Sequence, residues 1–287
     1  MSRVKAMQII EKISEMQRWS EAQRCEGRRI AFVPTMGFLH NGHLSLVRYA
    51  REHGDRVVVS VFVNPTQFAP QEDFAAYPRD FDRDRKLLEK ERVEILFCPA
   101  VQEMYPQGFQ TRVEVSELST FLCGAHRKGH FQGVATVVSK LFNAVRPHVA
   151  IFGEKDYQQL QVIRSLVRDL NFDIEIAGHP IVREADGLAM SSRNAYLSIE
   201  ERKAALCLYR SLNRAVSMVQ AGEVMAQAIT DVVRAEIARE SLAQLEYVKL
   251  CDTVTLAELD RVQDRTLLAL AVRIGKTRLI DNTMLTR

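Results

Sequence analysis

The chain has 287 residues, which is enough for one large or two ordinary domains with a sizeable core. Its hydrophobic fraction of 47% and charged fraction of 26% are average for globular proteins. A formal net charge of +3, with Lys and Arg spread along the chain, argues against a nucleic-acid-binding protein.

The sequence also disfavours membrane and secreted proteins. No apolar run approaches the roughly 20 residues that a membrane span needs, and the first residues do not resemble a signal peptide. The five cysteines are odd in number, scattered and without CxxC spacing. They indicate reduced, buried thiols, so the sequence predicts a cytoplasmic protein with no membrane or nucleic-acid partner.

The first 53 residues predict a helix and then a strand-turn-helix unit. The inward face of the opening amphipathic helix would carry Met7, Ile10, Ile13 and Trp19. Residues 28–34 form a short apolar run between charges and a proline, as buried parallel strands do. Residues from Leu44 onward have helical spacing.

The turn between this strand and helix is the first candidate site. Gly37 and Gly42 allow the backbone to approach a bulky ligand closely, and a helix N-terminus suits an anion such as phosphate. His40 and His43 lie one turn apart and would point the same way, toward one polyphosphate. Two ordinary surface histidines or a metal site would give the same spacing. Zinc is disfavoured because neither HExxH nor a nearby cysteine is present.

The next segment predicts a second buried strand, Val57 to Val63, and a polar loop at its carboxyl end. Ligands in parallel sheets bind at that edge, so Asn64 and Gln67 are candidates, although turn chemistry also explains them. The run VVVSVFV would serve as a dimer edge or as buried core.

Residues 80–147 predict a charged helix near 80–91, a strand at 93–98, a short strand at 111–118 and a core-facing helix ended by Pro147. The acids Asp80, Asp82 and Asp84 could hold a metal or simply form a solvated helix start. His130, at the start of the last helix, is a capping or packing residue or part of a site.

A fourth strand, His148 to Phe152, leads into another charged loop on the same edge of the sheet. Lys155 in this loop suits phosphate, and a salt-bridged helix cap with Asp156 is the alternative. After a last strand at 173–182, residues 191–193 present two hydroxyls and a guanidinium that match phosphate, although Ser-Ser also makes an ordinary helix cap.

Beyond residue 196 the pattern changes to two amphipathic helices and then strands, which suggests a small α+β domain. The sequence therefore predicts an α/β protein with a Rossmann-like, doubly wound parallel sheet in residues 1–185. Residues 186–287 would form the smaller α+β domain, a lid over the nucleotide edge.

Several segments in this order resemble one family. PTMGFLHNGHLSLV resembles the His-x-Gly-His signature of the nucleotidyltransferase superfamily, and in particular that of the pantoate–β-alanine ligases. NPTQF, GHFQGV, GEKDYQQL and MSSRN are similar to further motifs of that family. The likeness covers essentially the whole chain, and the conjunction of motifs is far more specific than any one of them.

The resemblance implies an enzyme that condenses (R)-pantoate with β-alanine to give pantothenate. ATP would be consumed through a pantoyl adenylate, with release of pyrophosphate and AMP. The family also implies Mg²⁺ and a homodimer, with small molecules as the substrates.

The resemblance also implies roles for matching residues. The expected catalytic residues are His43, His40 and Lys155. The ATP-binding residues would be Met36, Gly37, Phe38, Leu39, His40, Asn41, Gly42, His43, Gly153, Glu154, Lys155, Asp156, Val182, Met190, Ser191, Ser192 and Arg193. Gln67 and Gln159 would bind substrate, and Asp84 would be a metal ligand.

This chain departs from the family pattern at two positions. Arg83 stands beside Asp84 where relatives commonly show adjacent acids, which weakens the case for a protein-held Mg²⁺. Tyr157 stands where phenylalanine is frequent. The rival hypotheses are another nucleotidyltransferase, whose phosphate-bearing substrate would call for basic residues at Gln67 and Gln159, and a non-catalytic nucleotide sensor.

Overall fold

The computed structural model describes residues 6–287, which form two compact units that interleave along the sequence. The first comprises residues 6–119, 127–154 and 159–180, and the second residues 120–126, 155–158 and 181–287. The predicted division into domains 1–185 and 186–287 stays a prediction.

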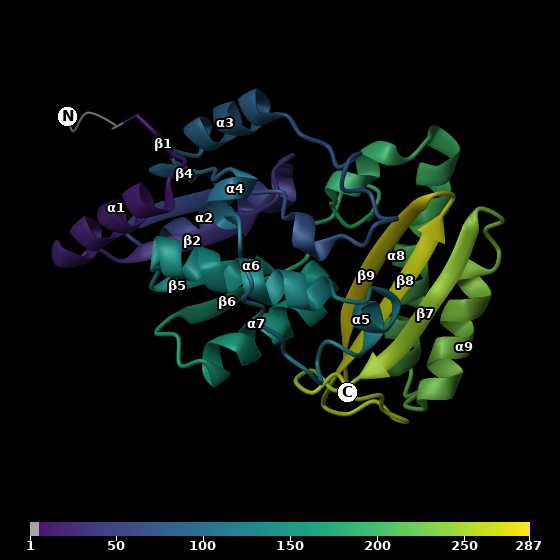
Figure 1. Ribbon diagram of the computed structural model, residues 1–287. Helices are drawn as coiled ribbons and strands as arrows, with labels where there is room; N and C mark the ends of the chain where they lie inside the picture. Colours follow the sequence, from purple (N-terminus) through teal and green to yellow (C-terminus); the bar gives the residue numbers. More distant parts are fainter. Residues whose placement is uncertain (1–5) are drawn as a thin grey trace. The chain divides into compact units, whose positions relative to one another are not determined.

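The first unit is built on a six-stranded sheet in which all neighbouring strands are parallel (Figure 1). Its strand order is β1 (Gln8–Ile10), β4 (Ile95–Phe97), β3 (Arg56–Val61), β2 (Ile30–Thr35), β5 (Val149–Gly153) and β6 (Glu175–His179). Chain order reverses direction between β2 and β5, which makes the sheet doubly wound. Ligands in such sheets bind outside the carboxyl ends of the strands at that reversal.

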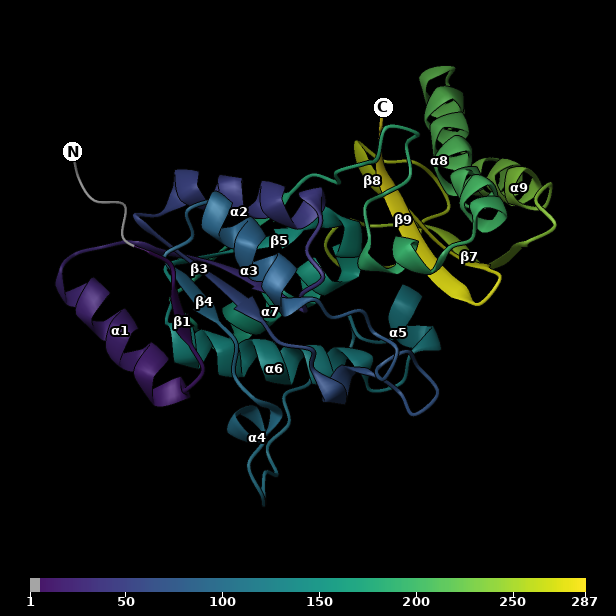
Figure 2. The ribbon, with the colours of Figure 1, turned by 90° about the horizontal axis from the view of Figure 1, so that it is seen from above.

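Helices cover both faces of this sheet. Helices α2 (Asn41–His53) and α3 (Phe81–Lys90) lie on one face, and α1 (Ile13–Cys25) and α6 (His130–Val145) on the other (Figure 2). Successive side chains of β2 point to opposite faces of the sheet, which explains the layers. Ala31 and Val33 belong to the core cluster that includes residues of α2. Phe32, between them, meets the Phe142 ring of α6 edge-on. The unit also contains η1 (Pro65–Gln67), α4 (Val101–Met104) and most of α7 (Tyr157–Asp169).

The second unit is an antiparallel sheet of β7 (Ala243–Cys251), β8 (Arg265–Ile274) and β9 (Thr277–Thr286). Helices α8 (Ile199–Gln220) and α9 (Ala226–Ile237) pack on it through an apolar core that includes Leu208, Ile229 and Leu270 (Figure 1). The short helices α5 (Leu122–His126) and η3 (Ser192–Tyr196) also belong to this unit. The short helix η2 (Glu154–Asp156) begins in the first unit and ends in the second. The two sheets confirm the predicted fold class.

Two sequence predictions need correction, and one alternative that the sequence left open is decided. Residues 8–10, expected in the opening helix, form strand β1 against β4, and the helix begins at Ile13; residues 1–5 lie outside the described part. Residues 111–118 contain no strand, and the Val113 N–H is bonded instead to the Thr136 hydroxyl of α6. Strand β3 lies between β2 and β4, so it is buried core and not a dimer edge. Within residues 6–287, no helix is long and apolar enough to cross a membrane.

Candidate active site

The loop after β2 has a left-handed backbone that one buried carboxylate holds in place. Gly37 and Phe38 have φ angles of +81° and +49°. The N–H groups of Phe38 and Leu39 donate to the two carboxylate oxygens of Asp84, each over 2.7 Å. A Cβ on Gly37 would lie 3.0 Å from Val61 and 3.1 Å from Asp84, so close packing as well as the φ angle favours glycine there.

Asp84 therefore does not fit the predicted role of metal ligand. Its side chain is 1% exposed, and both of its oxygens are taken by main-chain donors. Burial raises the pKa of Asp84, while the two amides and the Arg83 guanidinium act in the opposite direction. In the part of the chain described, no group of three or more His, Cys, Asp and Glu side chains could hold a metal ion. Asp84 shapes the loop that precedes the two histidines.

His40 and His43 lie together at the start of α2, as their spacing predicts. His40 is the N-cap residue, and its N–H donates to Nδ1 of His43 over 3.4 Å. The two ring centroids are 4.0 Å apart and the ring planes differ by 34°. Both side chains are partly exposed, and the positive end of the helix dipole lies beside them. This arrangement suits an anion.

Gln67 and Asn64 are positioned by η1, at the carboxyl end of β3. Their side chains are 8% and 1% exposed. The Asn64 amide nitrogen donates to Gln67 Oε1 and to the carbonyl of Gly133, each over 3.1 Å. A Cβ on Gly133 would lie 2.4 Å from the Thr66 carbonyl oxygen, so helix α6 can approach η1 only through a glycine here. Turn chemistry alone does not account for a buried amide pair of this kind.

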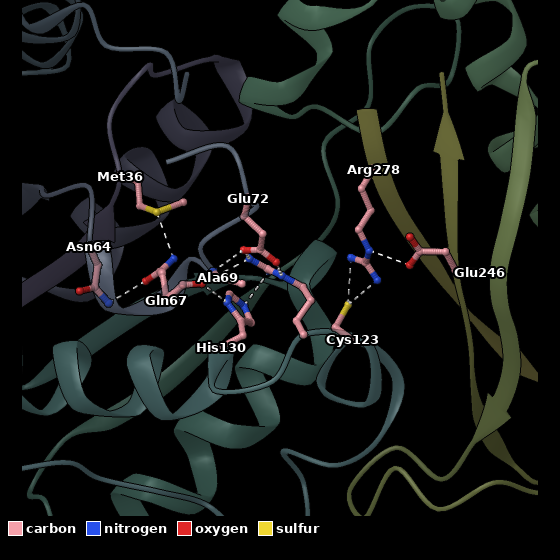
Figure 3. Close-up of polar contacts among 10 residues, drawn as sticks. Met36, Asn64, Gln67, Ala69, Glu72, Cys123, His130, Glu246 and Arg278 are labelled. Atoms are coloured by element: carbon pink, nitrogen blue, oxygen red, sulfur yellow. Dashed lines mark hydrogen bonds and ion pairs between the residues drawn. The ribbon is translucent and has the colours of Figure 1, made fainter. Parts of the chain in front are cut away.

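The main chain of Gln67 is held by a second network, shown in Figure 3. His130 Nδ1 donates to the Gln67 carbonyl over 2.8 Å, and His130 Nε2 lies 3.0 Å from Arg127 Nη1. Arg127 also binds both carboxylate oxygens of Glu72, over 2.7 and 2.6 Å. Burial would raise the pKa of Glu72, but the bonds and charge of Arg127 outweigh it and lower that pKa. His130 therefore holds the main chain of Gln67 in place through this hydrogen bond.

The loop after β5 carries the next predicted residues of the first unit. Gly153 ends β5, Glu154 opens η2, and Gln159 lies in the first turn of α7 with its side chain partly buried. Because β2 and β5 are adjacent, Gly153 and the Gly37 loop lie at the carboxyl ends of neighbouring strands. These two strand ends flank the reversal point of the sheet.

In the second unit, Lys155 is anchored by its main chain. Its carbonyl accepts a 2.9 Å hydrogen bond from the Asn282 side chain. The adjacent Asp281 is 1% exposed and forms a two-bond ion pair with Arg183, over 2.7 and 3.0 Å. Lys155 Nζ lies 3.7 Å from Asp156, whose side chain is half exposed, so this ion pair stabilises little.

Residues 182–193 of the second unit form a tight turn followed by η3. The Met190 N–H donates to the Val182 carbonyl over 3.0 Å, and Gly187, with φ +95°, makes the turn between them. A Cβ on Gly187 would lie 2.0 Å from the Tyr209 ring. The Ser191 hydroxyl accepts from the N–H of Arg193 over 3.3 Å. Ser191 is therefore the helix cap that the Ser-Ser pattern allowed, and Ser192 is buried behind it.

Sequence reasoning missed the supporting residues of the first unit. Tyr105, Arg127 and Glu72 carry no local motif, because their bonds join distant parts of the chain: Tyr105 to Asn64 spans 41 positions, Arg127 to Gln67 spans 60, and Arg127 to Glu72 spans 55. The helical period did carry a signal for Asp84, because it shares a face of α3 with the buried Leu88.

Comparisons with known proteins agree on one family. A family model described as pantoate-beta-alanine ligase matches residues 8–284. A pantothenate synthetase of Thermotoga petrophila is 55% identical over 279 residues, or 97% of this chain and 100% of the relative. A pantothenate synthetase of Desulfatibacillum aliphaticivorans is 56% identical over 279 residues, 97% of this chain and 99% of the relative.

Solved structures give the same result. The crystal structure of pantothenate synthetase from Thermus thermophilus matches with a TM-score of 0.93 and 45% identity, covering 98% of this chain and 100% of that one. The pantoate-beta-alanine ligase of Francisella tularensis, complexed with beta-gamma ATP and beta-alanine, matches with a TM-score of 0.81 and 35% identity. The match covers 97% of this chain and 98% of the Francisella tularensis chain.

Proposed function

This chain belongs to the pantoate–β-alanine ligase family, and from this premise we propose how its residues carry out the ATP-dependent formation of pantothenate. The observation that supports the proposal best is the adjacent His40–His43 pair at a helix N-terminus, directly after a parallel strand. The enzyme is a ligase that joins pantoate to β-alanine.

In the proposed reaction, a carboxylate oxygen of pantoate attacks the α-phosphorus of ATP and pyrophosphate leaves. The amine of β-alanine then attacks the acyl carbon of the pantoyl adenylate, AMP leaves, and pantothenate results. The first step brings an anion to a heavily charged phosphate, so catalysis is mainly positioning and stabilisation of charge. No covalent bond to the enzyme is needed.

We assign to His40, His43 and Lys155 the stabilisation of negative charge on the phosphates of ATP during the first step. His43 would donate a hydrogen bond, or a proton, to the phosphate undergoing transfer, and Lys155 would sit on the developing charge. The remaining ATP-binding residues follow the family motifs. They are Met36, Gly37, Phe38, Leu39, Asn41, Gly42, Gly153, Glu154, Asp156, Val182, Met190, Ser191, Ser192 and Arg193.

Gln67 and Gln159 would orient pantoate through uncharged amides. A neutral amide can bind a carboxylate or hydroxyl without neutralising the nucleophile, whereas a substrate with a phosphate group would favour Lys or Arg at these positions. The setting of Gln67 supports this assignment: the residue is buried, its side-chain oxygen accepts from Asn64, and its main-chain carbonyl accepts from His130. It argues against a nucleotidyltransferase for phosphorylated substrates.

Mg²⁺ is proposed to arrive with ATP. Phosphate oxygens and water suit this ion, and the carboxylate that family resemblance would offer, Asp84, is already bonded to two amides. The chain's own residues would bind the phosphates that carry the ion. We also propose, from the family alone, a homodimer located in the cytoplasm.

An omission assay tests the function. With ATP, Mg²⁺, pantoate and β-alanine present, the protein should release pyrophosphate and AMP and form pantothenate. Leaving out pantoate should abolish pyrophosphate release, and leaving out β-alanine should reduce it to roughly one equivalent per enzyme as the adenylate accumulates. Turnover with a phosphorylated acceptor in place of pantoate would indicate another nucleotidyltransferase, and ATP binding without pyrophosphate release would indicate a sensor.

A further inference from the structure

The side-chain amide of Gln67 has two ends with opposite chemistry. Its NH₂ group can donate to a substrate carboxylate, whereas its carbonyl oxygen would repel one. The two ends have nearly the same shape, so the hydrogen bonds around the amide decide which end is presented. For a residue 8% exposed, those bonds come from the protein.

Asn64 is held in one orientation by two main-chain groups. The Thr66 N–H donates to Asn64 Oδ1 over 3.3 Å, and Asn64 Nδ2 donates to the Gly133 carbonyl over 3.1 Å. An N–H can only donate and a carbonyl can only accept, so the oxygen and nitrogen of Asn64 cannot be exchanged. Asn64 is 1% exposed, which leaves it no compensating water.

The orientation of Asn64 fixes that of Gln67. The same Asn64 nitrogen lies 3.1 Å from Gln67, and the atom facing it must accept, which makes that atom Oε1. The Gln67 NH₂ group is thereby turned the other way, where its nitrogen is 3.1 Å from the sulfur of Met36 (Figure 3). A thioether is a weak acceptor, so a substrate oxygen would bind this NH₂ group better.

Tyr105 completes this chain of bonds from outside the motif. Its hydroxyl donates to Asn64 Oδ1 over 2.7 Å, the shortest of the three bonds to that oxygen. Its ring packs against Phe62 and Phe109, with centroids 6.3 and 5.1 Å away. Burial raises the pKa of Tyr105 still further above neutral, which favours the protonated hydroxyl that this bond requires.

We propose that Tyr105 is a positioning residue for pantoate. Tyr105 acts through Asn64, which orients Gln67 so that its NH₂ group faces a substrate oxygen. The inference rests on the proposed function, since it takes pantoate as the ligand of Gln67. Tyr105 does not touch the substrate in this account, so its whole effect passes through Gln67.

A double-mutant cycle tests the proposal. Tyr105→Phe removes only the hydroxyl and should lower kcat/KM for pantoate about five- to tenfold, the effect of one lost neutral hydrogen bond, with KM for ATP unchanged. In a Gln67→Ala background, the same change should alter kcat/KM for pantoate less than about twofold. Tyr49→Phe, a hydroxyl deletion on α2 of the same unit, is the matched control and should match the wild type.

Equal losses in both backgrounds, or a wild-type kcat/KM in Tyr105→Phe, would overturn the proposal. Asn64→Asp is an independent arm, because a carboxylate facing Gln67 should turn its NH₂ group inward and its carbonyl toward the substrate. This variant should lose at least as much kcat/KM for pantoate as Gln67→Ala, and a value near the wild type would also overturn the proposal. Wild-type protein without pantoate-dependent turnover would instead refute the proposed function.

Discussion

Replacing His43 with alanine is expected to lower the rate of pantoyl adenylate formation by on the order of a hundredfold or more, because the reaction loses a preorganised donor to the phosphate. The fold should survive. The imidazole is partly exposed in the first turn of α2, and the helix is held to the core by Leu44, Val47 and Ala50. Single-turnover formation of the adenylate with ATP and pantoate measures the effect without interference from the second step.

His53→Ala is the matched control for this variant. His53 is the last residue of the same helix, where its ring packs on Tyr49 and bonds to the Tyr49 carbonyl. It should retain the wild-type rate of adenylate formation. A wild-type rate in His43→Ala would contradict the assignment of the catalytic pair.

Replacing Lys155 with alanine should have an effect of similar size, on the order of a hundredfold. The variant lacks the positive charge that would lie beside the phosphate group that becomes more negative in the transition state. The contact that anchors Lys155 is made by its main-chain carbonyl, which alanine retains. The thermal unfolding midpoint should therefore stay within a few degrees of the wild type. Steady-state kcat and the unfolding curve are measured on the same preparation.

Lys249→Ala controls for the loss of a lysine in the second unit. Lys249 lies on β7 and pairs with Glu258 on the surface, so its removal should leave kcat unchanged. If Lys155→Ala unfolds while Lys249→Ala does not, Lys155 is a structural residue and the catalytic assignment is wrong.

The central strands of the first sheet could be predicted from sequence because each is buried on both faces. Residues 30–33 and 57–59 are apolar without alternation, and they form β2 and β3 in the middle of the sheet. The start of the chain was harder to interpret. Met7, Ile10 and Ile13 have helical spacing, but the pairing of residues 8–10 with β4, more than 80 residues away, makes these three a strand.

The strand predicted at residues 111–118 was wrong because that segment has no strand to pair with among the described residues. Residues 112–115 alternate between more and less exposed positions as a strand would, yet within residues 6–287 no neighbouring strand pairs with them. A strand needs its ladder of hydrogen bonds, which sequence pattern alone does not supply.

The site residues that sequence could propose are those within short motifs. His40 and His43 are three residues apart, and their local helix decides their geometry. Asp84 and Tyr105 act on residues about 40 positions away, through hydrogen bonds whose partners depend on the folded sheet. The family resemblance suggested Asp84 as a metal ligand, whereas in the fold its carboxylate is bonded to the loop before the histidines.

The central claim is that pantoate attacks the α-phosphorus of ATP, and pantoate labelled with ¹⁸O in its carboxylate tests it most directly. We predict that one labelled oxygen per turnover moves to the phosphate of AMP, as detected by mass spectrometry of the product. Label in inorganic phosphate, or no transfer of label while pantothenate forms, would contradict the account.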